Sequence, residues 1–159
     1  MDKILQNYTG ALFVLLILAV IVVSGCTGGS EEKAGEELKF DVMYTGYHAP
    51  FSEKKFIVIQ NEREFMELMN KLGLNLKPPD FEKYTVIALF MGEQRTGGYS
   101  ITVDRIVRAG DVVRVYVKNS VPSDTCIVIQ QITRPFQIVK VEKIAEKIEF
   151  VENTQEVKC

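Results

Sequence analysis

The chain of 159 residues contains one histidine, His48, which is the only side chain whose ordinary titration suits a general base near neutral pH. A serine hydrolase would pair His48 with Ser52 or Ser100 as its nucleophile. Neither serine stands in the Gly-x-Ser-x-Gly pattern of a nucleophile elbow. The stretch Tyr47–Ser52 is instead typical of a turn. We therefore expect His48 to be an exposed loop residue, with a hydrolase as the alternative.

Three further kinds of chemistry find no support in the spacing of the residues. No Cys/His pair has the spacing of a zinc site, and the glycines Gly97 and Gly98 are not followed by the lysine of a Walker motif. Cys126 stands in an apolar stretch, which disfavours the thiolate that a nucleophilic cysteine needs. The sequence therefore predicts a protein that is not an enzyme and that has no catalytic residue, metal site or cofactor.

One loop has the residue types of a binding site. Arg95 and Tyr99 flank the adjacent glycines Gly97 and Gly98, and arginine and tyrosine anchor many protein interfaces. Adjacent glycines also allow a positive φ or a close approach of the backbone. The alternative is a structural hairpin turn with a bulge, in which Tyr99 packs inward. Both interpretations stay open at the level of the sequence.

The charge balance argues against nucleic acid as a partner. The chain has 19 Lys and Arg residues and 21 Asp and Glu residues, a net charge of −2. It therefore has no basic excess with which to neutralise phosphates. Apolar residues make up 47% of the chain, which is enough for an ordinary buried core.

The N-terminal residues 1–25 are expected to be a lipoprotein-type signal peptide. The apolar run Ala11–Val23 has the length of a signal-peptide core and is shorter than a membrane span. It ends at Val23-Ser24-Gly25-Cys26, which resembles the lipobox, where small residues precede the cysteine that receives the lipid. Cys26 is therefore the predicted lipid attachment, and an uncleaved single-span anchor over Tyr8–Gly25 is the alternative. Either anchor would hold the rest of the chain at the extracytoplasmic face of the cell membrane.

The remaining chain is expected to be a tether followed by one folded domain. Residues 26–37 contain the anchor cysteine and a Gly-, Ser- and Glu-rich stretch without apolar periodicity, which predicts a flexible tether of about 18 Å reach. Residues 38–159 then form the domain. In an oxidising compartment Cys126 and Cys159 could form a disulfide. We favour the alternative, in which Cys126 is a buried apolar residue.

The domain is expected to be α+β and β-dominated, with one helix. Asn61 and Glu64 form a capping box, apolar residues recur at helical spacing from Phe65 to Leu72, and Gly73 suits a C-cap. Short strands at regular spacing favour an antiparallel sandwich or a barrel-like sheet. The expected strands are Leu38–Tyr47, Lys55–Gln60, Thr85–Met91, Tyr99–Val107, Val112–Lys118, Thr125–Thr133, Phe136–Val141 and Lys147–Val151.

The stretch from Tyr84 to Val141 resembles a known family. It contains an apolar strand, the motif Thr96-Gly97-Gly98-Tyr99, a valine-rich hairpin and the segment Thr133-Arg134-Pro135-Phe136. These features are similar to the PrcB C-terminal domain. Relatives are often lipoproteins, and the name-giving member is a non-catalytic lipoprotein subunit of a surface protease complex, where it supports maturation or stability of the protease. The resemblance thus implies a β fold, an extracytoplasmic location and a protease as partner.

Two motifs, Thr96–Tyr99 and Arg134–Phe136, are also similar to loops of chagasin-like protease inhibitors, which are immunoglobulin-like sandwiches. The Asn-Pro that precedes the first motif in that family is replaced by Gln94-Arg95, and the family's Gly-rich loop is not evident. We expect a membrane-anchored, non-catalytic module that stabilises or regulates a protease, with an inhibitor as the alternative. The residues expected to contact the partner are Arg95, Thr96, Gly97, Gly98, Tyr99, Arg134 and Phe136.

Overall fold

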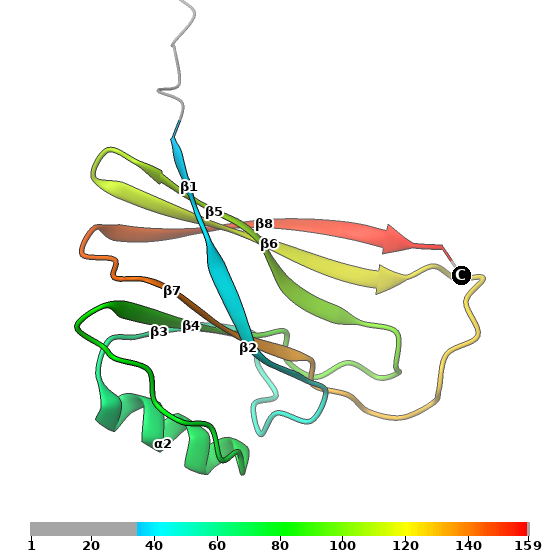
Figure 1. Ribbon diagram of the computed structural model, residues 1–159. Helices are drawn as coiled ribbons and strands as arrows, with labels where there is room; N and C mark the ends of the chain where they lie inside the picture. Colours follow the sequence, from blue (N-terminus) through cyan, green and yellow to red (C-terminus); the bar gives the residue numbers. More distant parts are fainter. Residues whose placement is uncertain (1–34, 159) are drawn as a thin grey trace, which may run out of the picture. The chain divides into compact units, whose positions relative to one another are not determined.

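The computed structural model describes residues 35–158, which form eight strands and one helix (Figure 1). The predicted signal peptide, the lipid-attachment residue Cys26 and most of the tether lie outside this range. In chain order the elements are β1 (Glu36–Leu38), β2 (Phe40–Gly46), β3 (Lys55–Ile59), α2 (Glu62–Leu72), β4 (Tyr84–Phe90), β5 (Ser100–Ala109), β6 (Val112–Pro122), β7 (Phe136–Glu142) and β8 (Lys147–Val157).

The strands form two four-stranded sheets that lie face to face. One sheet has the order β1-β5-β6-β8 and the other the order β2-β7-β4-β3. All neighbours are antiparallel except β6 and β8, which run parallel. Each sheet keeps two open edges, so the domain is a sandwich and not a closed barrel. The prediction of a β-dominated sandwich with one helix is confirmed.

A core of branched aliphatic side chains fills the space between the sheets. Alternate residues of each strand point inward, as the period of two requires. The buried residues that pack together there include Ile87, Leu89, Val139 and Val141 from one sheet and Ile101, Val103, Ile106, Val113, Val115 and Val117 from the other.

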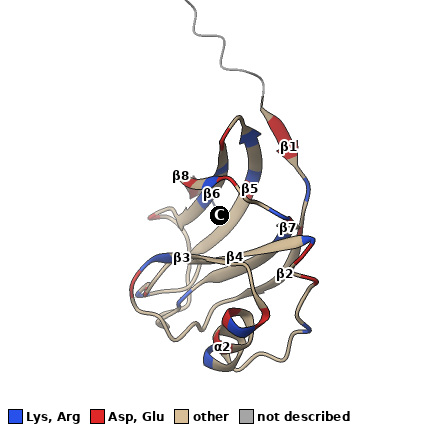
Figure 2. Cartoon of the chain, turned by 90° about the vertical axis from the view of Figure 1, so that its left-hand side faces the viewer, with Lys and Arg blue, Asp and Glu red and all other residues tan. Residues whose placement is uncertain are grey.

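The helix covers the outer face of the β2-β7-β4-β3 sheet and makes a third layer (Figure 1). Asn61 caps its first turn by accepting a hydrogen bond from the Glu64 backbone N–H, and Gly73 ends it with a φ of 65°. Its apolar stripe of Phe65, Leu68 and Met69 is buried against this sheet. Charged residues of both signs occupy the other side of α2 (Figure 2). Because β4 is covered on both faces, it has no polar side, as its sequence predicts.

The strand expected at Thr125–Thr133 is wrong. This stretch belongs to the long connection between β6 and β7, which crosses from one sheet to the other. Its apolar alternation is typical of a strand, but the stretch crosses between the sheets and pairs with no edge strand along its length. Only Thr133 forms a single bridge, to Gln94.

The first strand also begins earlier than expected. Glu36 and Glu37, assigned to the end of the tether, already pair with Arg108 and Val107 in β1. Lys39 separates β1 from β2, so one predicted strand contributes to both sheets. No helix within residues 35–158 is long and apolar enough to cross a membrane.

Candidate protein-binding site

A cavity of about 480 Å³ opens at one end of the sandwich. Three connections meet there: the end of β2, the β4–β5 connection and the β6–β7 connection. Its volume is within the range of small-ligand and side-chain pockets. The lining residues are Tyr47, His48, Gly97, Gly98, Tyr99, Ser100, Ser120, Ile129, Gln131, Thr133 and Val157.

Backbone hydrogen bonds hold the two main walls of the cavity together. The N–H of Gln94 donates to the Thr133 carbonyl over 2.8 Å, and the N–H of Thr133 donates back to Gln94 over 2.9 Å. The Gly97 N–H donates to the Ile129 carbonyl over 2.9 Å. The Thr133 hydroxyl donates to the Thr96 carbonyl over 2.8 Å. Segments some 35 residues apart in the sequence are thus fixed side by side.

Both glycines of the loop are needed for this close approach. A Cβ on Gly97 would lie 2.6 Å from Cγ1 of Ile129. Gly98 has a φ of 88°, and a Cβ there would lie 3.0 Å from Cγ1 of Val128. The pair therefore provides both properties that the sequence suggested, a positive φ and tight backbone contact.

The loop Gly92–Tyr99 is not a hairpin turn, because it joins β4 to β5 in opposite sheets. Tyr99 is half-buried: it packs against the core between the sheets and also lines the cavity. Tyr99 thus packs inward, as one interpretation expected, and is also accessible from the cavity.

Three isoleucines on the β6–β7 connection are exposed, and one of them, Ile129, lines the cavity. Ile127 is fully exposed, Ile129 is 64% exposed and Ile132 is 53% exposed. The sequence did not predict their exposure, because their apolar run was assigned to a strand. Three exposed isoleucines within six residues of one connection make this stretch a candidate contact surface.

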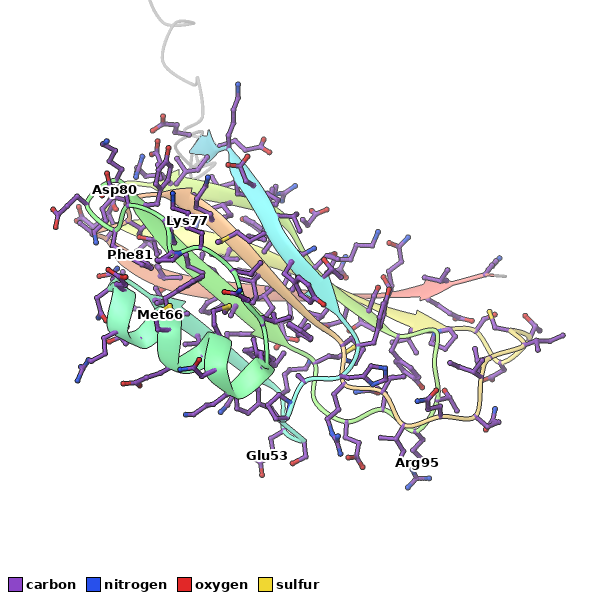
Figure 3. The ribbon with its side chains drawn as sticks, turned by 60° about the horizontal axis from the view of Figure 1, so that its bottom comes forward. Glu53, Met66, Lys77, Asp80, Phe81 and Arg95 are labelled. Atoms are coloured by element: carbon purple, nitrogen blue, oxygen red, sulfur yellow. The ribbon has the colours of Figure 1, made fainter. Side chains whose placement is uncertain are left out.

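Four of the seven predicted contact residues do not line the cavity. Arg95 is exposed and points away from the body of the domain (Figure 3). Thr96 is half-buried, and its backbone carbonyl is tied to Thr133. Arg134 connects the β6–β7 connection to two other loops. Its guanidinium donates to Glu93 in the β4–β5 connection over 2.5 Å, and its backbone N–H donates to the carbonyl of Tyr47, just after β2, over 2.7 Å.

Phe136 is a core residue, and the prediction that it contacts a partner is wrong. Its side chain is 4% exposed. Its ring stacks on Phe90 and Tyr44, with centroid distances of 5.7 Å in both cases. The motif that suggested a loop contact is in fact the start of β7.

The cavity is neutral, and this limits its chemistry. None of its lining residues is Asp, Glu, Lys or Arg. It does bring His48 near Ser100, the pair considered for hydrolysis, but within residues 35–158 no hydrogen bond joins them. Ser52 does not line the cavity. Across the part of the chain that the structure describes, no cluster of His, Cys, Asp and Glu could hold a metal ion.

Cys126 anchors the beginning of the exposed connection. It is disulfide-bonded. The expectation of a buried apolar cysteine is therefore wrong. Nearby, the Ser123 N–H donates to the Val157 carbonyl over 3.0 Å, so the connection is fastened to the end of β8.

The opposite end of the sandwich is closed by ion pairs. Arg108 of β5 contacts Glu146 over 2.7 Å, Glu142 over 2.5 Å and Glu36 over 3.5 Å. The hydrogen bond with Glu142 raises the pKa of Arg108 above its usual value. The backbone N–H groups of Glu146 and Ala145, and then Arg108, lower the pKa of Glu146. We call these four residues, Arg108, Glu36, Glu142 and Glu146, the Arg108 cluster.

Comparison with known proteins gives one match. Residues 85–142 match the family described as PrcB C-terminal. The match runs from β4 to the end of β7 and so includes both connections that wall the cavity. No curated protein and no solved structure matches the chain. The resemblance predicted from the motifs is confirmed: residues 85–142 are similar to the PrcB C-terminal family.

Proposed function

We propose that this protein is a membrane-anchored, extracytoplasmic and non-catalytic binding module that acts as an accessory subunit of a protease. One observation supports binding above all: Ile127, Ile129 and Ile132 are exposed on the β6–β7 connection, and Ile129 lines the neutral cavity. The family match supports the protease as the class of partner, because the name-giving member of the family is a subunit of a protease complex.

The energetics favour a protein partner at this end. Removing an isoleucine side chain from water contributes about 1.5–3 kcal/mol when its burial is complete. Ile127 and Ile129 could together anchor an interface, since a few central side chains carry most of the binding energy. Tyr47, which is exposed, and Tyr99 add aromatic surface around the cavity.

The position of the anchor fits this use. The first described residues pair with Arg108, near one end of β5. Ser100, at the other end of β5, lines the cavity. Strand β5 has 10 residues, which separate the two ends by about 30 Å. A lipid on Cys26 would thus hold the domain by one end and leave the cavity end free. Confinement to the membrane raises the effective concentration of the module towards a co-anchored partner.

Photo-cross-linking tests the proposal. A photoreactive side chain replaces Ile127 in the full chain, and the matched control replaces Met66, an exposed apolar residue on α2. We expect position 127 to cross-link to one defined protease in native membranes and position 66 to give no such product. A scatter of products from position 127, or the same protease from both positions, would contradict the proposal.

An inhibitor remains the second candidate, on one observation. The loop Thr96–Tyr99 is fixed by hydrogen bonds to the β6–β7 connection, so the two loops present a rigid edge. Titration of the purified chain against cysteine and serine proteases distinguishes the two roles. A stabilising subunit leaves proteolysis intact or raises it, whereas an inhibitor abolishes it at stoichiometric amounts.

A further inference from the structure

The exposed connection has unpaired backbone N–H groups, although the Ile129 carbonyl accepts a hydrogen bond from Gly97 and the Val128 carbonyl accepts one from the Gln130 side chain. Within residues 35–158, none of the six backbone N–H groups from Ile127 to Ile132 donates a hydrogen bond. Residues 126–130 contain no helix, turn or bend. The stretch Ile127-Val128-Ile129-Gln130-Gln131-Ile132 is nevertheless rich in the β-branched residues that favour strands. A strand-forming sequence with free donors is a template for another strand.

We propose that Ile127–Ile132 docks an extended, uncharged segment of the protein partner by backbone strand pairing, with the neutral cavity receiving the side chain of an apolar residue. This deepens the proposed function and rests on it, because it names the chemistry by which the partner is recognised. In strand addition, main-chain hydrogen bonds provide affinity and pockets for alternate side chains provide specificity.

Charge complementarity selects this kind of occupant. The stretch from Thr125 to Thr133 contains no charged residue, and none lines the cavity. A charged side chain entering the cavity would lose hydration and find no counter-charge. A neutral segment with apolar and small polar side chains meets hydroxyl and amide groups there, from Ser100, Ser120 and Gln131.

One edge strand of the domain, β8, shows how charge protects an edge from pairing. β8 is an edge strand of 11 residues with β6 on one side only. It carries Lys147, Glu149, Glu152 and Glu156, and charged residues on an edge discourage pairing. Glu152 also forms an ion pair with Lys54 over 2.6 Å and accepts a hydrogen bond from the Asn119 side chain over 2.7 Å. The β6–β7 connection has no such protection.

The test measures amide hydrogen exchange of the full chain in detergent with two capped peptides of about eight residues, the length of an ordinary strand. The first alternates Val and Ser, and the second replaces its two central Val residues by Asp. We expect the first peptide to slow exchange at residues 127–132 and to bind at least about tenfold more tightly than the second. Protection at β8 instead, or equal binding of the two peptides, would overturn the proposal.

Two variants at one exposed position separate backbone from side chain. Gln130→Pro removes the N–H of residue 130, whereas Gln130→Ala keeps it and removes only the side chain. We expect Gln130→Pro to weaken the first peptide about tenfold and Gln130→Ala less than about twofold. Equal weakening by both variants would overturn strand pairing. So would concentration-dependent dimerisation that Gln130→Pro abolishes, because the occupant would then be a second copy of the chain.

The outcomes also distinguish this inference from the function it rests on. If position 127 cross-links a protease equally well in the Gln130→Pro chain, the accessory role stands and strand pairing fails. If the neutral peptide protects residues 127–132 but no protease is cross-linked, strand pairing stands and the accessory role fails. If the proline disturbs the fold of the connection, the hydrogen-exchange protection of the unaltered chain still tests whether the peptide pairs with residues 127–132.

Discussion

The two ends of the sandwich satisfy their polar and apolar groups in opposite ways. At one end, Arg108 pairs with three carboxylates that come from β1, from β7 and from the β7–β8 connection. At the other, the cavity has neutral walls, and the β6–β7 connection has three exposed isoleucines and six backbone N–H groups that donate no hydrogen bond within the described residues. At the first end the charged groups are paired within the described chain. At the second end, apolar side chains and backbone N–H groups remain available for contacts with a partner.

This difference indicates how one small domain divides stability from binding. The Arg108 cluster fastens the strand where the chain begins to be described, so it supports the fold near the predicted anchor. The cavity end is held by a few backbone hydrogen bonds between loops, which fix its geometry without burying its apolar surface. Loops placed by a rigid scaffold are the usual location of binding sites.

The largest expected effect tests which residues of the cavity end belong to the core. Phe136→Ala should lower the free energy of unfolding by about 3–5 kcal/mol, because it empties a buried ring site against Phe90 and Tyr44. Arg95→Ala should change it by less than about 0.5 kcal/mol, since Arg95 is exposed. Urea unfolding of both variants measures this. Similar free energies of unfolding for the two variants would contradict the placement of Phe136 in the core.

A glycine comparison between the two ends should have the next largest effect. Gly98 and Gly110 both have positive φ, 88° and 63°, so alanine at either position incurs the left-handed penalty of about 1–2 kcal/mol. Only at Gly98 would the new Cβ also meet neighbours, at 3.0–3.1 Å, which adds roughly 1 kcal/mol. Thermal unfolding should therefore place Gly98→Ala below Gly110→Ala. The reverse order would contradict the tight contact between the connections.

The Arg108 cluster should affect stability without affecting binding. Arg108→Ala removes charge-assisted hydrogen bonds that are partly exposed to water, so we expect a loss of about 1–2 kcal/mol. Cross-linking from position 127 should be unchanged in this variant. A loss of the cross-link at temperatures where Arg108→Ala is fully folded would show that the two ends are coupled.

The smallest expected effect is a dependence on acid. The pKa of Glu146 is lower in the folded chain than its usual 4.5, so its ionised form stabilises the fold above that pH. This stability is lost as the pH falls through the folded value. The unfolding temperature should decline as the pH falls from about 5 to about 3, and less steeply in Glu146→Gln. Equal slopes of unfolding temperature against pH for the two chains would show that ionised Glu146 does not stabilise the fold.

The sequence predicts the regular elements well because their signals are local. Asn61, Glu64 and Gly73 define the helix through contacts within one turn, and the apolar β4 needs only cover on both faces. The stretch Thr125–Thr133 shows where this fails. Its alternation is that of a strand, but pairing depends on whether a sheet offers a free edge, which no local pattern contains.

The candidate site was predictable only in part for the same reason. Gly97, Gly98 and Tyr99 were identified from their types, whereas Tyr47, Ser120 and Gln131 join them only through long-range folding. Phe136 was misassigned because a motif gives residue types without burial. The exposed isoleucines did leave a signal, an apolar run just after a turn. That signal becomes interpretable once the run is known to lie outside both sheets.

Hydrogen exchange of the full chain, alone and in the complex isolated from its native membrane, tests the central claim most directly. We predict that the partner slows exchange at residues 97–99 and 127–132 and leaves residues 36–38 and 106–108 unchanged. Protection at the Arg108 end, or on the outer face of the β1-β5-β6-β8 sheet, with none at residues 127–132, would contradict the assignment of the neutral end as the binding site.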